Sequence, residues 1–179
     1  MDLTRNDILQ LLDELIELLI AKSIKGVITI YGGSAVSYYH DERGVTRDID
    51  SIITPSKEVL EVAKELSEIH PGLQENWLNM AIVTIMPPVP DDNPSIYYQD
   101  DNLKVQFGSE EYLLAMKAVV PRRSEQDKYD AALLFNSLGL KSWLEINTMV
   151  SKYFPGSGNW GSQELFWEEV EYLAGELKA

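Results

Sequence analysis

Two aspartates that stand one residue apart are the residues best suited to chemistry in this sequence. Asp48 and Asp50 lie in DIDSIIT, whose alternating and apolar residues predict a β-strand over 48–54. Residues i and i+2 of a strand face the same side, so both carboxylates should project together while Ile49 points into the core. Paired carboxylates are hard oxygen ligands that suit Mg²⁺. We therefore predict that Asp48 and Asp50 hold a metal ion.

A glycine-rich turn precedes the two aspartates and could bind phosphate. The β-branched run VITIY at 27–31 predicts a buried strand that ends at Gly32 and Gly33, and SAVSYYH at 34–40 predicts a short helix after the turn. Glycines let the backbone approach a phosphate closely, and the amides at a helix N-terminus attract its negative charge. Ser34 adds a hydroxyl group to this turn. The turn is therefore a candidate phosphate site.

Each feature alone has an ordinary explanation. Two glycines after a strand usually form a simple turn, and an isolated Asp-x-Asp usually carries no function. Their order along the chain, on neighbouring strands, favours a combined phosphate and metal site. Ile52 and Ile53 continue the second strand with apolar residues, which indicates a central strand rather than an exposed edge.

The whole stretch, GGSAV followed by GVTRDID, resembles the signature of the polymerase-β-like nucleotidyltransferase superfamily. Gly33-Ser34, thirteen further residues and Asp48-x-Asp50 carry the likeness. It is similar in particular to the AbiEii-like and related minimal nucleotidyltransferases, several of which act as toxins in toxin–antitoxin pairs. WLN at 77–79 and the segment 110–139 resemble the same group, so the likeness covers roughly residues 26–155.

The resemblance implies a role for each residue of the pattern. Gly33 and Ser34 would hold the triphosphate of an NTP, which Mg²⁺ bound to the two aspartates would bridge. Lys117 would reach the phosphates or the charge that develops during transfer. The implied nucleotide-binding set is Gly32, Gly33, Ser34, Arg47 and Lys117, and the implied catalytic set is Asp48, Asp50, Lys117 and Asp127.

Two of these assignments have a competing structural explanation. Lys117 borders an apolar helical stripe, where a lysine can lay its stem along the core and keep its charge in water. Asp127 and Asp130 stand near Arg123 and Lys128, so ion pairs on a helix surface would explain them too. Because Asp127 starts an apolar stripe, we expect it to point inward with Lys117 or a metal as its partner, and Asp130 to face solvent.

The sequence departs from the superfamily pattern at one position. A later strand usually supplies a third carboxylate, but the comparable strand here is LKVQF at 103–107, and its polar face shows Lys104 and Gln106. Asp127 could replace the missing acid. Alternatively, the chain is a degenerate member that binds a nucleotide or a protein partner without catalysis.

If Asp127 takes the place of the missing third carboxylate, we expect an enzyme that transfers an NMP from an NTP to a hydroxyl group and releases pyrophosphate. The acceptor would be a tRNA 3′ end, a protein hydroxyl or a small molecule, and an antitoxin would be a further protein partner. The formal charge of −14 argues against binding of long nucleic acids, unless the local basic residues suffice.

The composition fits an intracellular globular protein. The 179 residues are 45% hydrophobic and include no cysteine, which excludes disulfides and thiolate metal sites. No window approaches the ~20 apolar residues of a membrane span, and the first residues lack the features of a secretory signal. We therefore expect a cytoplasmic protein that does not bind membranes.

The elements that must position these residues predict an α+β fold. We expect a nucleotidyltransferase core with an N-terminal helix over 1–108, in which a small mixed sheet is flanked by helices, and a helical part over 109–179. Besides the elements above, the predicted strands are 81–86, 95–99 and 103–107, and the predicted helices are 4–23, 56–70, 109–120, 124–139, 141–154 and 162–177.

Overall fold

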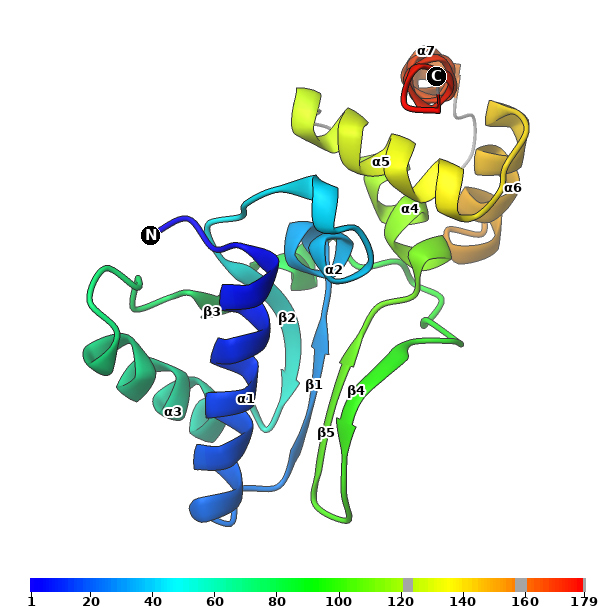
Figure 1. Cartoon of the computed structure of the whole chain (residues 1–179). Helices are drawn as coiled ribbons and strands as arrows, with labels where there is room; N and C mark the ends of the chain where they lie inside the picture. Colours follow the sequence, from blue (N-terminus) through cyan, green and yellow to red (C-terminus); the bar gives the residue numbers. More distant parts are fainter. Residues whose placement is uncertain (121–123, 157–160, 179) are drawn as a thin grey trace. The chain divides into compact units, whose positions relative to one another are not determined.

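The computed structural model describes residues 1–120, 124–156 and 161–178, and for 161 and 162 it describes the backbone alone. It divides the chain into two compact units, which Figure 1 shows together with the element labels. The first unit comprises Met1–Thr84 and Pro94–Gly108, and the second comprises Ile85–Asn93 and Ser109–Ala179. The predicted α+β class is confirmed, because the described residues form a five-stranded mixed sheet and seven α-helices.

The first unit contains the sheet, whose strands follow the order β3-β2-β1-β5-β4. Strand β1 is antiparallel to β2 and parallel to β5, while β3 runs parallel to β2 and β4 antiparallel to β5. The elements of this unit are α1 (Arg5–Ala21), β1 (Gly26–Ile30), α2 (Gly32–Tyr39), β2 (Ile49–Thr54), α3 (Ser56–Ile69), β3 (Leu78–Asn79), β4 (Ser95–Gln99) and β5 (Leu103–Phe107), with short 3-10 helices at Asp41–Arg43 and Ala81–Ile85.

The central strands alternate between a fully buried face and a partly open one. Ile49 on β2, Ile28 on β1 and Val105 on β5 are at most 1% exposed, as expected for the face on which α1 and α3 lie (Figure 1). Helix α1 begins with the predicted capping box, in which Thr4 and Asp7 exchange side-chain and backbone hydrogen bonds. Each element thus contributes its apolar side to one core in this unit.

The prediction of a third strand over 81–86 is wrong. Residues Ala81–Ile85 form a 3-10 helix, and the two-residue strand β3 just before them pairs with β2 instead. The amide of Ala81 donates to the Asn79 side-chain oxygen at 2.8 Å, which turns the chain out of the sheet. Within this apolar run only Ile82 is buried, so apolarity alone did not identify a strand.

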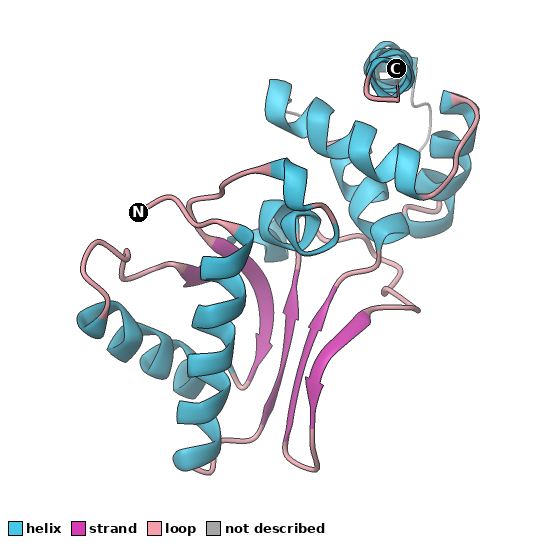
Figure 2. Ribbon diagram, in the orientation of Figure 1, coloured by secondary structure: helices cyan, strands magenta, loops and turns pink. Residues whose placement is uncertain are grey.

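The predicted strands 95–99 and 103–107 are confirmed as β4 and β5, which form a hairpin and are drawn as arrows in Figure 2. One carboxylate oxygen of Asp100 accepts hydrogen bonds from the amides of Asn102 and Leu103, both at 2.7 Å. These two backbone bonds, together with the Tyr98 hydroxyl, lower the pKa of Asp100. The turn therefore holds the ends of the two strands in register.

The second unit is helical in the described residues. Its helices are α4 (Glu110–Val119), α5 (Glu125–Ser137), α6 (Trp143–Tyr153) and α7 (Gly161–Glu176). Ser109 and Ser124 cap α4 and α5 as the sequence predicts. The core of this unit includes Tyr112, Tyr153 and Trp167, and the indole of Trp167 donates to the Ala118 carbonyl at 3.1 Å.

None of the described helices combines the length and the apolarity that a membrane span requires.

Candidate functional site

Strand register gathers the polar residues of the sheet on one face. Asp50 pairs with Asn79 on β3, and Ile52, two residues further along β2, pairs with Thr29 on β1. Thr29 in turn pairs with Gln106 on β5. Directly paired residues of neighbouring strands share a face, as do residues i and i+2 of one strand. We call this side, which carries Asp50, Asn79, Thr29 and Gln106, the aspartate face.

The two aspartates flank a buried isoleucine at the start of β2. The strand begins at Ile49, one residue later than predicted, and Asp48 comes directly before it. Ile49 is fully buried, whereas Asp48 and Asp50 are half-buried. The amide nitrogen of the Asn79 side chain donates to a carboxylate oxygen of Asp48 at 3.1 Å. Asn79 thus holds Asp48 beside the aspartate face.

Gly32 is the residue that lets the Asp50 carboxylate lie against the glycine turn. Its φ of +63° falls in the left-handed region, which strains any other residue type except Asn or Asp. A Cβ atom at this position would also stand 2.7 Å from the Asp50 Oδ2 atom. Gly32 and the Asp50 carboxylate, eighteen residues apart in the sequence, are therefore in direct contact.

Gly33, in the same way, lets the guanidinium of Arg43 lie against the turn. A Cβ atom here would overlap the guanidinium of Arg43, whose Cζ atom would lie 2.9 Å away. Arg43 is only 8% exposed and donates a hydrogen bond to the Val45 carbonyl oxygen. The sequence pattern implied Arg47, which is exposed, and gave Arg43 no role in the site. No periodicity indicates Arg43, because it ends a three-residue 3-10 helix in a polar segment.

Helix α2 starts at the turn with the geometry of an anion site. Its N-cap residue, Tyr31, makes no side-chain capping bond, and the first amides of any helix lack partners within the helix. The Ser34 hydroxyl is buried and donates to the Tyr31 carbonyl at 3.0 Å. Since that proton is engaged inside the turn, the backbone amides at Gly32 and Gly33 are the better phosphate donors.

Gln106 occupies the place where the superfamily pattern expects a third acid. Its amide nitrogen donates to the Thr29 hydroxyl at 2.9 Å. Its amide oxygen is buried, and in the part of the chain that the structure describes it has no hydrogen-bond partner. The described residues also contain no group of three or more His, Cys, Asp or Glu placed to hold a metal. The acidic set on this face is thus Asp48 and Asp50.

Lys117 and Asp127 lie in the second unit, where they form an ion cluster with Asp130. The Lys117 ammonium stands 2.6 Å from Asp127 Oδ1 and 2.9 Å from Asp130 Oδ2. Burial of Asp127 opposes its ionisation, but the Lys117 charge and hydrogen bonds from Ser124 outweigh it and lower the pKa of Asp127. Lys117 is thus the partner that the sequence led us to expect for Asp127.

The expectation that Asp130 faces solvent is wrong. The Asp130 side chain is fully buried, while that of Asp127 is 24% exposed. Asp127 is the third helical residue of a capping box with Ser124, which places its carboxylate at the helix start. All six residues of α5 from Asp130 to Phe135 are buried. The helix therefore has no single buried face, and the apolar periodicity of the sequence could not show which side chains point inward.

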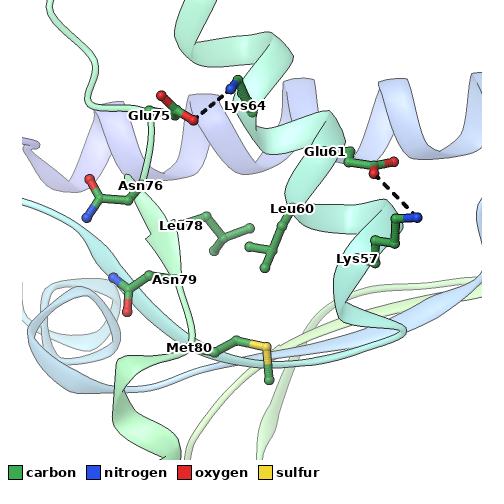
Figure 3. Close-up of a pocket in the computed structure, with 9 residues that line it drawn as sticks. All are labelled: Lys57, Leu60, Glu61, Lys64, Glu75, Asn76, Leu78, Asn79 and Met80. Atoms are coloured by element: carbon green, nitrogen blue, oxygen red, sulfur yellow. Dashed lines mark ion pairs between the residues drawn. The ribbon is translucent and has the colours of Figure 1, made fainter.

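A groove borders the aspartate face beside the edge strand β3 (Figure 3). It measures about 750 Å³, and the Asn79 that binds Asp48 is one of its lining residues. Leu60 and Leu78 supply apolar surface from α3 and β3. The charged lining residues form two ion pairs, Lys57–Glu61 at 4.0 Å and Lys64–Glu75 at 2.7 Å. The groove therefore offers apolar surface with compensated charges next to Asp48.

Comparisons of this chain with protein-family models, curated proteins and solved structures gave no match.

Proposed function

We propose that this protein is a Mg²⁺-dependent nucleotidyltransferase that transfers an NMP from an NTP to an acceptor hydroxyl and releases pyrophosphate. The observation that carries the proposal is the contact between the glycine turn and the acidic pair. Asp50 lies against Gly32, and Asp48, two residues earlier, accepts a hydrogen bond from Asn79, the strand partner of Asp50. A turn that binds phosphate beside two carboxylates is what transfer from a polyphosphate requires.

The residues on the aspartate face fit a magnesium ion. Mg²⁺ is commonly held by one or two carboxylates together with substrate phosphates and water, so Asp48 and Asp50 suffice without a third acid. The amide of Asn79 fixes one of these carboxylates, as outer-shell partners do in metal sites. The ion, when bound, would neutralise phosphate charge and orient the reacting phosphoryl group.

The glycine turn would bind the phosphate chain itself. The amides at the start of α2 and the helix dipole favour negative charge at Gly32 and Gly33. The buried guanidinium of Arg43 lies directly against Gly33 and adds a positive charge to the same turn. A triphosphate on these groups would meet the two carboxylates through the metal.

A second function, nucleotide binding without transfer, is favoured by Gln106. A carboxylate at this position would act as the base that takes the proton from the attacking hydroxyl, and an amide cannot do so. The Gln106 amide is also bonded to Thr29 and partly buried, which fits a structural role. In this case the protein would sense or sequester an NTP, or present it to a partner.

Labelled NTPs distinguish the two functions. The protein is incubated with Mg²⁺, each α-labelled NTP and one of three acceptor mixtures: bulk tRNA, purified proteins, or aminoglycosides. Transfer of label with pyrophosphate release, lost in Asp50→Asn, is the result expected for the transferase. Calorimetric binding of Mg-NTP without transfer to any acceptor would support the binding function instead. Absence of both binding and transfer would refute both.

A further inference from the structure

A groove between α5 and α7 in the second unit has no role in the proposed function. It measures about 490 Å³. Glu125 and Lys128 of α5 form one wall, and Leu165, Glu168, Glu169 and Tyr172 of α7 form the other. We call it the α7 groove. Every residue named here lies within the second unit.

Helix α7 has apolar side chains on two sides, and only one of them is covered. Trp167 and Val170 are at most 1% exposed and face the core of the unit. Leu165 and Tyr172, in contrast, are 67% and 72% exposed and line the α7 groove. They stand seven residues apart, which places them two turns apart on the same helix face. Two large exposed apolar side chains on one face of a helix indicate a surface that binds a partner.

The charge around this apolar pair is negative. The lining includes three glutamates and one lysine, and that lysine is already paired with Glu125 at 3.2 Å and Glu169 at 3.0 Å. The α7 sequence from Gly161 to Glu176 contains five glutamates and neither lysine nor arginine. A ligand with apolar and positively charged groups would therefore complement the groove.

We propose that the α7 groove binds an amphipathic helix of a basic partner protein. Apolar residues spaced three, four and seven apart on that helix would cover Leu165 and Tyr172, and its flanking Lys and Arg would face the glutamates. A second copy of this chain fits the groove poorly. An isologous contact would bring Glu168 and Glu169 of one copy against the same residues of the other.

The probe for this proposal is a synthetic helical peptide with Leu at i, i+3, i+4 and i+7 and Lys elsewhere. Its control is a scrambled peptide of the same composition and charge, which cannot form an apolar face. Binding to the full chain is measured by fluorescence anisotropy in low and physiological salt. We expect the helical peptide to bind at least tenfold more tightly than the scrambled one, with an affinity that falls as salt rises.

Matched variants locate the binding surface. Leu165→Ser combined with Tyr172→Ser should weaken peptide binding at least tenfold, because interface energy concentrates in a few large side chains. Leu144→Ser changes a residue of α6 that is 57% exposed but does not line the groove, and it should bind like the wild type. Circular dichroism checks that each variant is folded.

Three results would overturn the proposal. Equal affinity for the two peptides would show attraction by charge alone. Unchanged binding by the double variant would place any bound peptide elsewhere on the chain. Self-association in sedimentation experiments that is lost in the double variant would assign the surface to a second copy of this chain.

Discussion

The contact between Gly32 and the Asp50 carboxylate can be tested by adding one methyl group. Gly32→Ala places a Cβ atom 2.7 Å from Asp50 Oδ2, a distance at which one of the two groups must move. The same substitution forces alanine into a backbone conformation with a φ of +63°. These two costs have different origins, and they can be separated experimentally.

Gly44 provides the control for the backbone cost. Its φ of +83° is also positive, with a ψ of −139°, and a Cβ atom there would meet nothing within 4 Å. Gly44→Ala should therefore cost backbone strain alone, about 1–3 kcal/mol. Gly32→Ala should add about 1–3 kcal/mol of overpacking against Asp50 to a backbone strain of about 1–2 kcal/mol. Its total destabilisation is then about 2–5 kcal/mol.

Urea unfolding of four proteins measures the separate terms. The wild type, Gly32→Ala, Asp50→Ala and the double variant form a double-mutant cycle. Once Asp50 is truncated, Gly32→Ala should cost only its own backbone strain, about 1–2 kcal/mol. The coupling energy should therefore be about 1–3 kcal/mol, with the double variant more stable than the two single effects predict.

The refuting result is an absence of coupling. If the coupling energy between Gly32→Ala and Asp50→Ala is below about 0.5 kcal/mol, Asp50 does not lie against the turn. A joint phosphate and metal site would then lack its main structural support.

Four further predictions follow from the two units. Asp50→Asn should raise the dissociation constant of Mg-NTP at least tenfold in calorimetry with little loss of stability, because it removes charge but not volume. Lys117→Met should lower the free energy of unfolding by about 3 kcal/mol in urea, since it removes a cation that pairs with the buried Asp130. Because the pKa of Asp127 is lowered, its ionised carboxylate stabilises the folded protein fully above the unfolded pKa of about 3.9. This stabilisation is lost as the pH falls through the lower pKa of the folded state. The stability of Asp127→Asn in acid unfolding should therefore depend less steeply on pH than that of the wild type. Gln106→Leu with Thr29→Val should leave the stability unchanged or raise it by about 1 kcal/mol in thermal unfolding, because the pair removes an unpartnered amide oxygen, and a clear loss would show that Gln106 is satisfied.

The sequence predicted those elements whose signals are local. Capping residues such as Thr4 and Ser124 bond to amides three residues away, so the starts of α1 and α5 could be read directly. The strand around Ile49 was predicted from its alternation, and only its first residue differed. The prediction of a strand over 81–86 was wrong because a strand also needs a neighbouring strand with which to pair. The edge of β2 that is not paired with β1 is already paired with β3.

Parts of the candidate site depend on contacts between distant residues, which sequence patterns do not reveal. The packing of Arg43 against Gly33 joins a loop to a helix start, and the bond from Asn79 to Asp48 spans 31 residues. A one-helix periodicity also misassigned Asp130, because α5 is surrounded by other helices of its unit. The acidic pair itself was accessible from sequence, since its spacing and the strand period agree.

The ion cluster of the second unit changes which residues can be expected to hold a triphosphate. The Lys117 charge is shared between Asp127 and Asp130, and one of these carboxylates is fully buried. Drawing Lys117 toward a phosphate would break its ion pair with that buried charge, a penalty of several kcal/mol. Arg43 needs no such movement, since its guanidinium already lies against the glycine turn. Phosphate binding by this protein should therefore depend on Arg43 and the α2 amides more than on Lys117, the reverse of the order that the sequence pattern implies.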